Sequence, residues 1–392
     1  MSVYAGPDQL TAEGSIIDMT VASRGIVYES GKRPERRSCA FPAICVSPSG
    51  RWLCAFRAAP TKSAVTGQHP LLTWSDDQGH SWSEPAAPFS PVEVEGRPGN
   101  FRAASITALA GGTMIAVVCW VDQSDPSLPF YNPETEGLLD TRIFLSRSVD
   151  DGVTWSAPTL VDTSPFKVPT PLTGPILRLR NEDLACQFEL NKPYRDPSVW
   201  RHSSVLLFSM DKGRSWPEHV ITSNDPANHV FYWDQRPGVL ADGRVLDLFW
   251  TYDNREAIYL NIHARVSADH GRSWSEMWDT LVPGQPAAPV SLPDSRIALV
   301  YVDRIGPPTI KMRASEDGGR TWPEASEIVL QAALVPPQSV LKSGMNDAWS
   351  EMSKLSVGLP VTALTRDGEV VVVYYAGPHF DETSIHWVRV RA

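Results

Sequence analysis

Acidic side chains stand at the ends of apolar, strand-like runs of this sequence. Asp122, Glu189, Asp253 and Asp303 each follow such a run, and Asp234 precedes another in YWDQRPGVL. A carboxyl group in an apolar setting has a raised pKa and can protonate a leaving oxygen, while a second carboxylate acts as base or nucleophile. Two such groups cleave glycosidic bonds, and their separation decides retention or inversion. The pattern therefore favours glycoside chemistry, with these five carboxylates as the candidates.

Arginines occur at comparable positions. Arg102 and Arg236 lie near strand starts, and Arg57 and Arg304 lie at strand ends. A guanidinium group can hold a carboxylate through two parallel hydrogen bonds, so this set predicts an acidic sugar, such as a uronic or ulosonic acid, as ligand. The alternative for any single residue is a structural ion pair, for example between Asp303 and an arginine.

Aromatic side chains complete the candidate site. Tyr375 ends an apolar run and is a further catalytic candidate. Tyr252 and Trp233 could stack on a sugar ring, although core packing explains them equally well. A tyrosine that abstracts a proton beside an arginine-neutralised carboxylate would make the protein a uronate lyase, and the residue types do not separate this from hydrolysis.

One eight-residue pattern, Ser-x-Asp-x-Gly-x-(Ser/Thr)-Trp, recurs five times and must position these residues. It begins at Ser75, Ser148, Ser209, Ser267 and Ser315. The pattern is typical of a turn in which Asp caps backbone N–H groups, Gly takes a positive φ and Trp folds back as an apolar plug. The repeated carboxylates are therefore expected to be structural: Asp77, Asp150, Asp211, Asp269 and Asp317.

A second repeat, an apolar hairpin around a polar turn, interleaves with the first. Its six copies begin at Phe41, Ala104, Gly174, Arg236, Ala288 and Leu359. The first five are each followed by the box, so one hairpin plus one box predicts a four-stranded blade. The sixth lacks a box, and we expect the N-terminal segment TVASRGIVYES to supply its outer strand, which would pair the two chain ends and protect open strand edges. The sequence thus predicts an all-β, six-bladed propeller as a single domain over residues 1–392, with residues 1–20 as an extension.

The boxes and interleaved hairpins resemble the sialidase (neuraminidase) superfamily over nearly the whole chain. The resemblance implies a site over the central axis, an Asp acid/base, a Tyr nucleophile supported by a Glu, and three arginines that clamp a sugar carboxylate. Counted from the hairpin turns, the position of the supporting Glu falls on Asp234.

The other family positions carry different residues. The first arginine falls on Ala40, a later arginine on Trp250 and the tyrosine on Leu359. The stretch AAPTKSAVTGQHPLLTW, where the acid/base Asp is expected, contains no Asp or Glu. The sequence therefore predicts a sialidase-like glycoside hydrolase for an acidic sugar that lacks the standard residues. A uronate-type lyase and a non-catalytic carbohydrate- or protein-binding propeller are the alternatives.

Composition and short motifs limit the classes of partner, cofactor and compartment that the sequence predicts. The chain has 392 residues, 42% of them hydrophobic, and a net charge of −10, which disfavours phosphate-rich nucleic acid as a partner. No apolar stretch is long enough to predict a membrane span, and no nucleotide or zinc motif predicts a cofactor or metal. Five cysteines without a C-x-x-C pair indicate buried thiols in a reducing compartment, and with no visible signal peptide they favour the cytoplasm. No feature indicates an oligomeric state.

Overall fold

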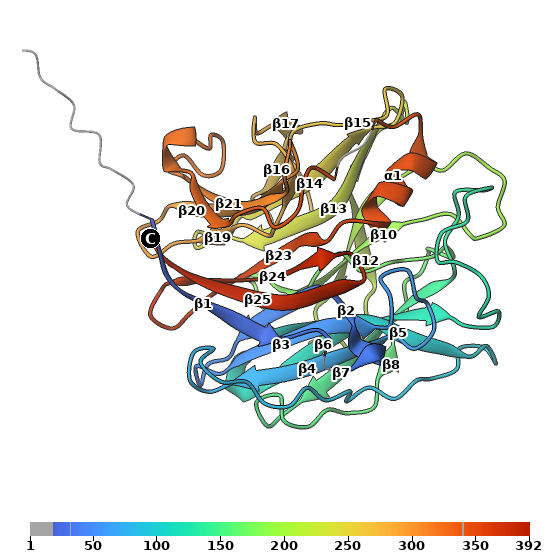
Figure 1. The fold of residues 1–392 in the computed structure, drawn as a ribbon, viewed down its shortest axis with the longest axis horizontal. Helices are drawn as coiled ribbons and strands as arrows, with labels where there is room; N and C mark the ends of the chain where they lie inside the picture. The colour runs from blue at the N-terminus through green and yellow to red at the C-terminus, as the bar shows by residue number, and fades with distance from the viewer. Residues whose placement is uncertain (1–18, 32, 339–340) are drawn as a thin grey trace, which may run out of the picture.

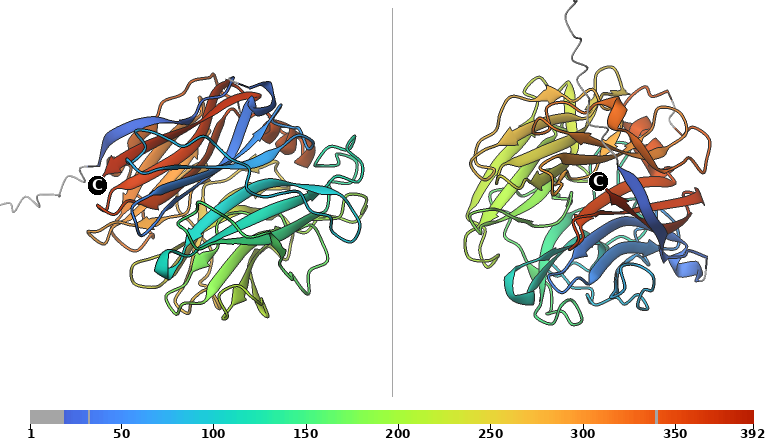
Figure 2. Two further views of the ribbon diagram at one scale, coloured as in Figure 1. Left: turned by 90° about the horizontal axis from the view of Figure 1, so that it is seen from below. Right: turned by 90° about the vertical axis from the view of Figure 1, so that its left-hand side faces the viewer.

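Short strands surround a common centre in a β-propeller, as the computed structural model shows (Figures 1 and 2). The structure describes residues 19–31, 33–338 and 341–392, so most of the predicted N-terminal extension lies outside it. The strands form antiparallel meanders because apolar runs are separated by glycine- and proline-rich turns. The predicted all-β propeller is confirmed.

Two sheets have four strands each. One consists, in spatial order, of β5 (Gly99–Ala108), β6 (Met114–Asp122), β7 (Thr141–Ser148) and β8 (Thr159–Leu160). The other consists of β12 (Glu218–Asn224), β11 (Ser203–Ser209), β10 (Leu184–Leu190) and β9 (Leu177–Arg178).

Two further sheets have five strands each. The first runs through β13 (Val230–Val239), β14 (Val245–Asp253), β16 (His263–Ser267) and β17 (Trp278–Asp279), with β15 (Ile258–Tyr259) paired to β14. The second runs through β18 (Gln285–Pro286), β20 (Ile297–Asp303), β21 (Thr309–Ser315) and β22 (Ile328–Gln331), with β19 (Val290–Ser291) paired to β20.

The largest sheet contains both chain ends. It runs through β23 (Val357–Leu364), β24 (Val370–His379), β25 (Glu382–Arg391), β2 (Ser38–Val46), β3 (Trp52–Ala59) and β4 (His69–Ser75), with β1 (Thr20–Tyr28) paired to β25. The two halves meet at one parallel bridge, between Ser38 and Thr383. The predicted pairing of the N-terminal and C-terminal strands is present, and the blue β1 lies beside the red β25 in Figure 1.

Four short helices interrupt the strands in the described part of the chain. The α-helix is α1 (Met345–Ser353), and the 3-10 turns are η1 (Pro34–Arg36), η2 (Ala110–Gly112) and η3 (Glu324–Ser326). All five cysteines are buried and free, as the sequence predicted.

The five Asp boxes are structural, as predicted. In the first, Ser81 donates to Asp77 from its backbone N at 2.8 Å and from its hydroxyl, and Ser75 Oγ donates to the same carboxylate at 2.8 Å. The other four boxes repeat these bonds. Hydroxyl and backbone donors from Ser81 lower the pKa of Asp77 to about 2, since they stabilise its charged form. The carboxylates of the five boxes are therefore engaged in capping turns.

The box glycines also fix how neighbouring sheets pack. Gly152 has φ +83°, and a Cβ there would lie 2.0 Å from Cδ2 of Leu53, which belongs to β3 of the largest sheet. Gly271 and Gly319 approach Leu206 and Leu246 of the preceding sheets in the same way, at 3.2 and 2.5 Å. A side chain at these positions would push two sheets apart.

Replacing Gly152 by Ala should therefore destabilise the propeller. Because overpacking adds to backbone strain, we expect a loss of about 3 kcal/mol in the free energy of unfolding. Gly306→Ala is the matched control, since Gly306 has φ +84° but no atom within 4 Å of the position that a Cβ would take. That substitution adds backbone strain alone, which costs about 1 kcal/mol. Equal losses of the two variants in urea unfolding would contradict the packing argument.

Candidate active site

A cavity of about 540 Å³ lies where the first strands of the sheets converge. Its lining includes residues from the strands that open successive hairpins: Phe41, Arg102, Asp234, Gln285 and Leu359. Second strands contribute from their C-terminal halves or just beyond their ends: Glu189, Trp250, Arg304 and Tyr375. The converging strands thus bring together side chains that lie far apart in the sequence.

A bulge on the first strand aims several of these side chains. Phe41, Asp234 and Leu359 have φ values of 50°, 54° and 47°, and each lies where the register with the second strand shifts. A non-glycine residue in this left-handed region is strained, and a bulge redirects its side chain. All three line the cavity. The three residues with strained backbone therefore lie where side chains turn into the cavity.

The acidic side of the cavity is built around Asp234. Its carboxylate receives hydrogen bonds from Arg236 Nη2 at 2.5 Å and from Gln285 Nε2 at 2.7 Å, and its backbone N donates to Glu189. Burial raises the pKa of Asp234, the charge of Arg236 opposes this rise, and the nearby Glu189 carboxylate adds to it. Asp234 therefore has the setting of a general acid.

Three arginines lie at or behind the wall of the cavity: Arg57 and Arg304 are buried, and Arg102 is partly exposed. Arg57 donates to Gln68 Oε1 at 2.7 Å, and Arg102 shares that acceptor at 3.4 Å. Arg304 donates to Gln285 Oε1 at 2.8 Å and to the Val357 carbonyl. These acceptors are neutral, and within the described residues Arg57 Nη1 and Arg304 Nε have no hydrogen-bond partner. Burial lowers the pKa of Arg57, Arg102 and Arg304. A buried charge of this kind is costly unless a ligand supplies the counter-charge.

Tyr375 lies among these cations. Its hydroxyl is 3.1 Å from Lys62 Nζ, and burial raises its pKa to about 12 while Arg304 opposes that rise. Gly358 makes the arrangement possible, because a Cβ there would lie 2.8 Å from Arg304 Nη2 and 3.0 Å from Tyr375 Oη. The phenol is therefore protonated at neutral pH and sits beside basic groups.

Aromatic side chains cover the cavity. Trp349 of α1 stacks on Tyr131 with ring centroids 4.6 Å apart, and Tyr131 Oη donates to Asn346 at 2.7 Å. Phe130 lies over the Arg102 guanidinium at 4.4 Å. The helix and the loop over residues 129–138 are thus joined across the cavity, and their flat rings are suited to contact with a sugar face.

Six of the residues proposed from sequence line this cavity: Asp234, Glu189, Tyr375, Arg102, Arg304 and Trp233. Three others lie directly behind them. Arg57 is fully buried next to Gln68, Arg236 is paired with Asp234, and Tyr252 stacks under Trp233 with centroids 4.7 Å apart.

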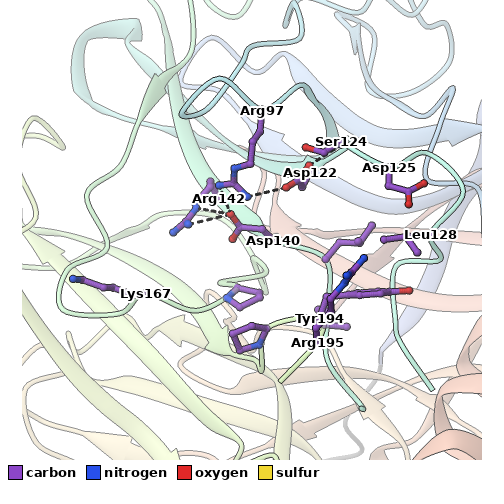
Figure 3. Close-up of a pocket in the computed structure, with 14 residues that line it drawn as sticks. Arg97, Asp122, Ser124, Asp125, Leu128, Asp140, Arg142, Lys167, Tyr194 and Arg195 are labelled. Carbon is purple, nitrogen blue, oxygen red and sulfur yellow. Dashed lines mark hydrogen bonds and ion pairs between the residues drawn. The ribbon is translucent and has the colours of Figure 1, made fainter. Parts of the chain in front are cut away.

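Three proposed carboxylates lie outside the cavity. Asp253 caps the turn after β14 by accepting the backbone N–H groups of Arg255 and Glu256, and Asp303 pairs with Lys311 at 2.9 Å. Asp122 lines a separate surface pocket, where Arg97 bridges it to Asp140 (Figure 3). The ion-pair alternative thus describes Asp303 and Asp122, with Lys311 and Arg97 as partners.

Sequence reasoning missed Lys62 and the aromatic residues of the loop over 129–138. Lys62 lies in AAPTKSAVTGQHPLLTW, a segment searched only for acids, and a search for any charged side chain in that loop would have found it. Phe130 and Tyr131 carry no such signal, because they enter the cavity from a long connection outside the repeat.

The comparisons place the chain among BNR-repeat propellers. The family model described as BNR repeat-like domain matches residues 115–332, more than half of the chain. A structure of a protein of unknown function from Dyadobacter fermentans has a TM-score of 0.72 at 19% identity and covers 95% of this chain and 99% of its own.

Two sialidases have the same fold at low identity. A Hadza microbial sialidase has a TM-score of 0.62 at 16% identity, over 93% of this chain and 68% of its own. The intramolecular trans-sialidase from Ruminococcus gnavus, solved with oseltamivir carboxylate, has a TM-score of 0.61 at 12% identity, over 93% and 96%. A comparison with curated proteins found no match.

Two further features were sought across residues 19–31, 33–338 and 341–392. No helix there has the length and apolar character to cross a membrane. No group of three or more His, Cys, Asp or Glu side chains in those ranges is arranged to hold a metal.

Removing Arg236 should leave Asp234 as a half-buried carboxylate without an ionic partner, held only by the Gln285 amide. We expect Arg236→Met to lower the free energy of unfolding by about 3 kcal/mol at neutral pH. Because the folded-state pKa of Asp234 is already raised and would rise further, the loss should shrink as the pH falls through that pKa toward the unfolded-state value of about 4, below which the carboxyl group is protonated in both states.

The double variant Asp234→Asn/Arg236→Met is the matched control. It removes the charge that Arg236 compensates, so urea unfolding should recover most of the lost stability. A loss that does not depend on pH, or one that the second substitution fails to relieve, would show that Arg236 acts through packing alone.

Proposed function

The chain belongs to the BNR repeat-like domain family, and from this premise we propose that it is a sialidase-like glycoside hydrolase that cleaves an acidic sugar in the central cavity. The observation that carries the proposal is the cluster of buried cations whose hydrogen-bond acceptors are neutral. An anionic ligand would supply the missing counter-charge. A sugar carboxylate bound by Arg102 and Arg304 fits, since both line the cavity.

Tyr375 is the proposed nucleophile. A carboxylate beside an acidic sugar would be repelled by the sugar's own charge, whereas a phenol is neutral until it reacts. The family position for the tyrosine is occupied by Leu359, but Tyr375 comes from the neighbouring strand, where its partner in register is Gly358. A hydroxyl group can thus serve the same cavity from the adjacent strand.

Asp234 is the proposed general acid. Its buried position raises its pKa, which favours the protonated form needed to protonate a leaving oxygen. Glu189 lies next to it and keeps that pKa high by charge repulsion. Trp233 and Trp349 are proposed to contact the sugar face. Asp122, Asp253 and Asp303 have no part in this proposal, because each is engaged elsewhere.

The activity should depend on Asp234 and Tyr375. Assayed on 4-methylumbelliferyl glycosides of N-acetylneuraminate, glucuronate and galacturonate, the protein should release the fluorophore and a saturated sugar. Tyr375→Phe should lower kcat/KM on these substrates by about 10²–10⁴-fold, because it removes the bond-forming group. Asp234→Asn should cause a loss of about 10²–10⁴-fold on glycosides with a sugar or alkyl leaving group, which needs a proton, and a much smaller one on the methylumbelliferyl substrates.

Asp253→Asn is the matched control, since it makes the same chemical change at a carboxylate outside the cavity and should leave kcat/KM unchanged. An unsaturated product would show that the protein is a lyase and not a hydrolase. Ligand binding that raises Tm without product release would identify a carbohydrate-binding propeller. Either result would overturn the proposed reaction.

We also propose that the ring has six blades and closes through its two ends. The single bridge between Ser38 and Thr383 suggests that the largest sheet is two blades in contact. Further support comes from the antiparallel pairing of β1 with β25.

Deleting residues 1–28 tests this closure. The deletion would expose the edge of β25 and should cause partial unfolding and self-association, because an unpaired edge strand recruits other chains. Deleting residues 1–18 alone is the control and should leave a monodisperse protein in size-exclusion chromatography. Identical behaviour of both truncations would contradict closure by β1.

A further inference from the structure

Lys62 enters the cavity from the loop that follows β3. Its backbone N donates to Asp381 Oδ1 at 2.7 Å, which ties the loop to the turn between β24 and β25. Its Nζ donates to the Leu355 carbonyl and, at 3.1 Å, to Tyr375 Oη, and it lies 4.8 Å from the centroid of the Tyr375 ring. The Tyr375 hydroxyl in turn donates to the Leu355 carbonyl at 3.5 Å. The Lys62 side chain is therefore directed at the proposed nucleophile.

The charges around Lys62 are mostly positive. Arg304 follows β20, Arg57 lies on β3 and Arg102 lies on β5, while Asp381 is the opposing negative charge. Burial, together with repulsion from these arginines, holds the pKa of Lys62 well below its usual range. A desolvated lysine among other cations is a known way to obtain a neutral amine that can accept a proton.

We propose that Lys62 is the proton acceptor for Tyr375, so that its amine takes the phenolic proton as Tyr375 attacks the sugar. This assignment rests on the proposed glycoside hydrolase function. The 3.1 Å separation is within hydrogen-bond reach, as a proton transfer requires.

The proton and electron balance closes over two steps. In the first, Tyr375 Oη bonds to the anomeric carbon and its proton passes to Lys62 Nζ; the bond to the leaving oxygen breaks, and that oxygen takes its electron pair and a proton from Asp234. In the second, water attacks the anomeric carbon and gives a proton to Asp234. The bond to Tyr375 then breaks, and Lys62 returns the proton to its oxygen. The net reaction is addition of water across the glycosidic bond.

The substrate's own charge would assist the first step. A carboxylate bound beside Arg304 and Arg102 reduces the repulsion that Lys62 experiences, so the protonated amine becomes more favourable. The lysine would thus hold a proton more readily when an anionic sugar is bound. A neutral glycoside would lack this effect.

Two variants separate proton acceptance from charge. Lys62→Met removes both, whereas Lys62→Arg keeps a positive charge that does not deprotonate in proteins. We expect both variants to lower the rate of Tyr375 glycosylation by about 10²–10⁴-fold, with KM rising only in Lys62→Met. Lys62→Met should fold, because it replaces a desolvated amine among arginines by an apolar side chain of similar length. Lys167→Met, at an exposed lysine of the surface pocket, is the control and should match the unsubstituted protein.

The pH profile gives a second readout. The unsubstituted protein should lose kcat/KM as the pH falls through the pKa of Lys62, since a protonated amine cannot accept the phenolic proton. This acidic limb should be absent from Lys62→Met. An active Lys62→Arg variant with an unchanged rate and profile would overturn the proposal and leave the hydrolase function standing.

A titration that needs no substrate tests the amine directly. In protein labelled with ¹³C at lysine Cε, one NMR signal should titrate well below the others and disappear in Lys62→Met and Lys62→Arg. If the signal of Lys62 titrates with the surface lysines, the proposal is wrong whatever the activity. A protein that cleaves no acidic glycoside would overturn the proposed function and this assignment together.

Discussion

The box glycines allow each sheet to press its turn against the sheet before it, and the central cavity depends on that contact. At Gly152 the approach to Leu53 leaves no room for a Cβ. The Asp of each box keeps the turn rigid by capping its backbone N–H groups, as Asp150 does for Thr154. Because the sheets are held close in this way, their first strands converge and bring polar side chains into one space.

Two energetically unfavourable features occur where the first strands converge on the cavity. Phe41, Asp234 and Leu359 hold strained backbone, and Arg57 and Arg304 hold positive charge with neutral acceptors. Rigid packing between sheets must offset both, since strain and buried charge persist only when the surrounding structure enforces them. An anionic ligand would relieve the electrostatic part.

The repeats predicted the propeller and much of its site, because spacing in a repeat carries over from one unit to the next. Counting nine residues back from Gly243 located Asp234, which does line the cavity. The same counting could not find Lys62 or Tyr131, which reach the cavity from connections outside the repeat. It also could not exclude Asp303, since the ion pair with Lys311 on the next strand is not visible in the repeat spacing.

A lysine beside Tyr375 suits a site that is proposed to bind an acidic sugar better than a carboxylate would. A carboxylate next to Tyr375 would add to the rise that Asp234 already causes in the pKa of the phenol, and it would repel an acidic sugar. Lys62 has neither effect, and its neutral amine adds no charge to the cluster formed by Arg304 and Arg102 until it accepts a proton. The segment where the family carries an acid has instead a base. In this proposal the proton donor Asp234 lies on β13 and the proton acceptor Lys62 lies in the loop that follows β3, so the two proton transfers use separate groups from distant parts of the sequence.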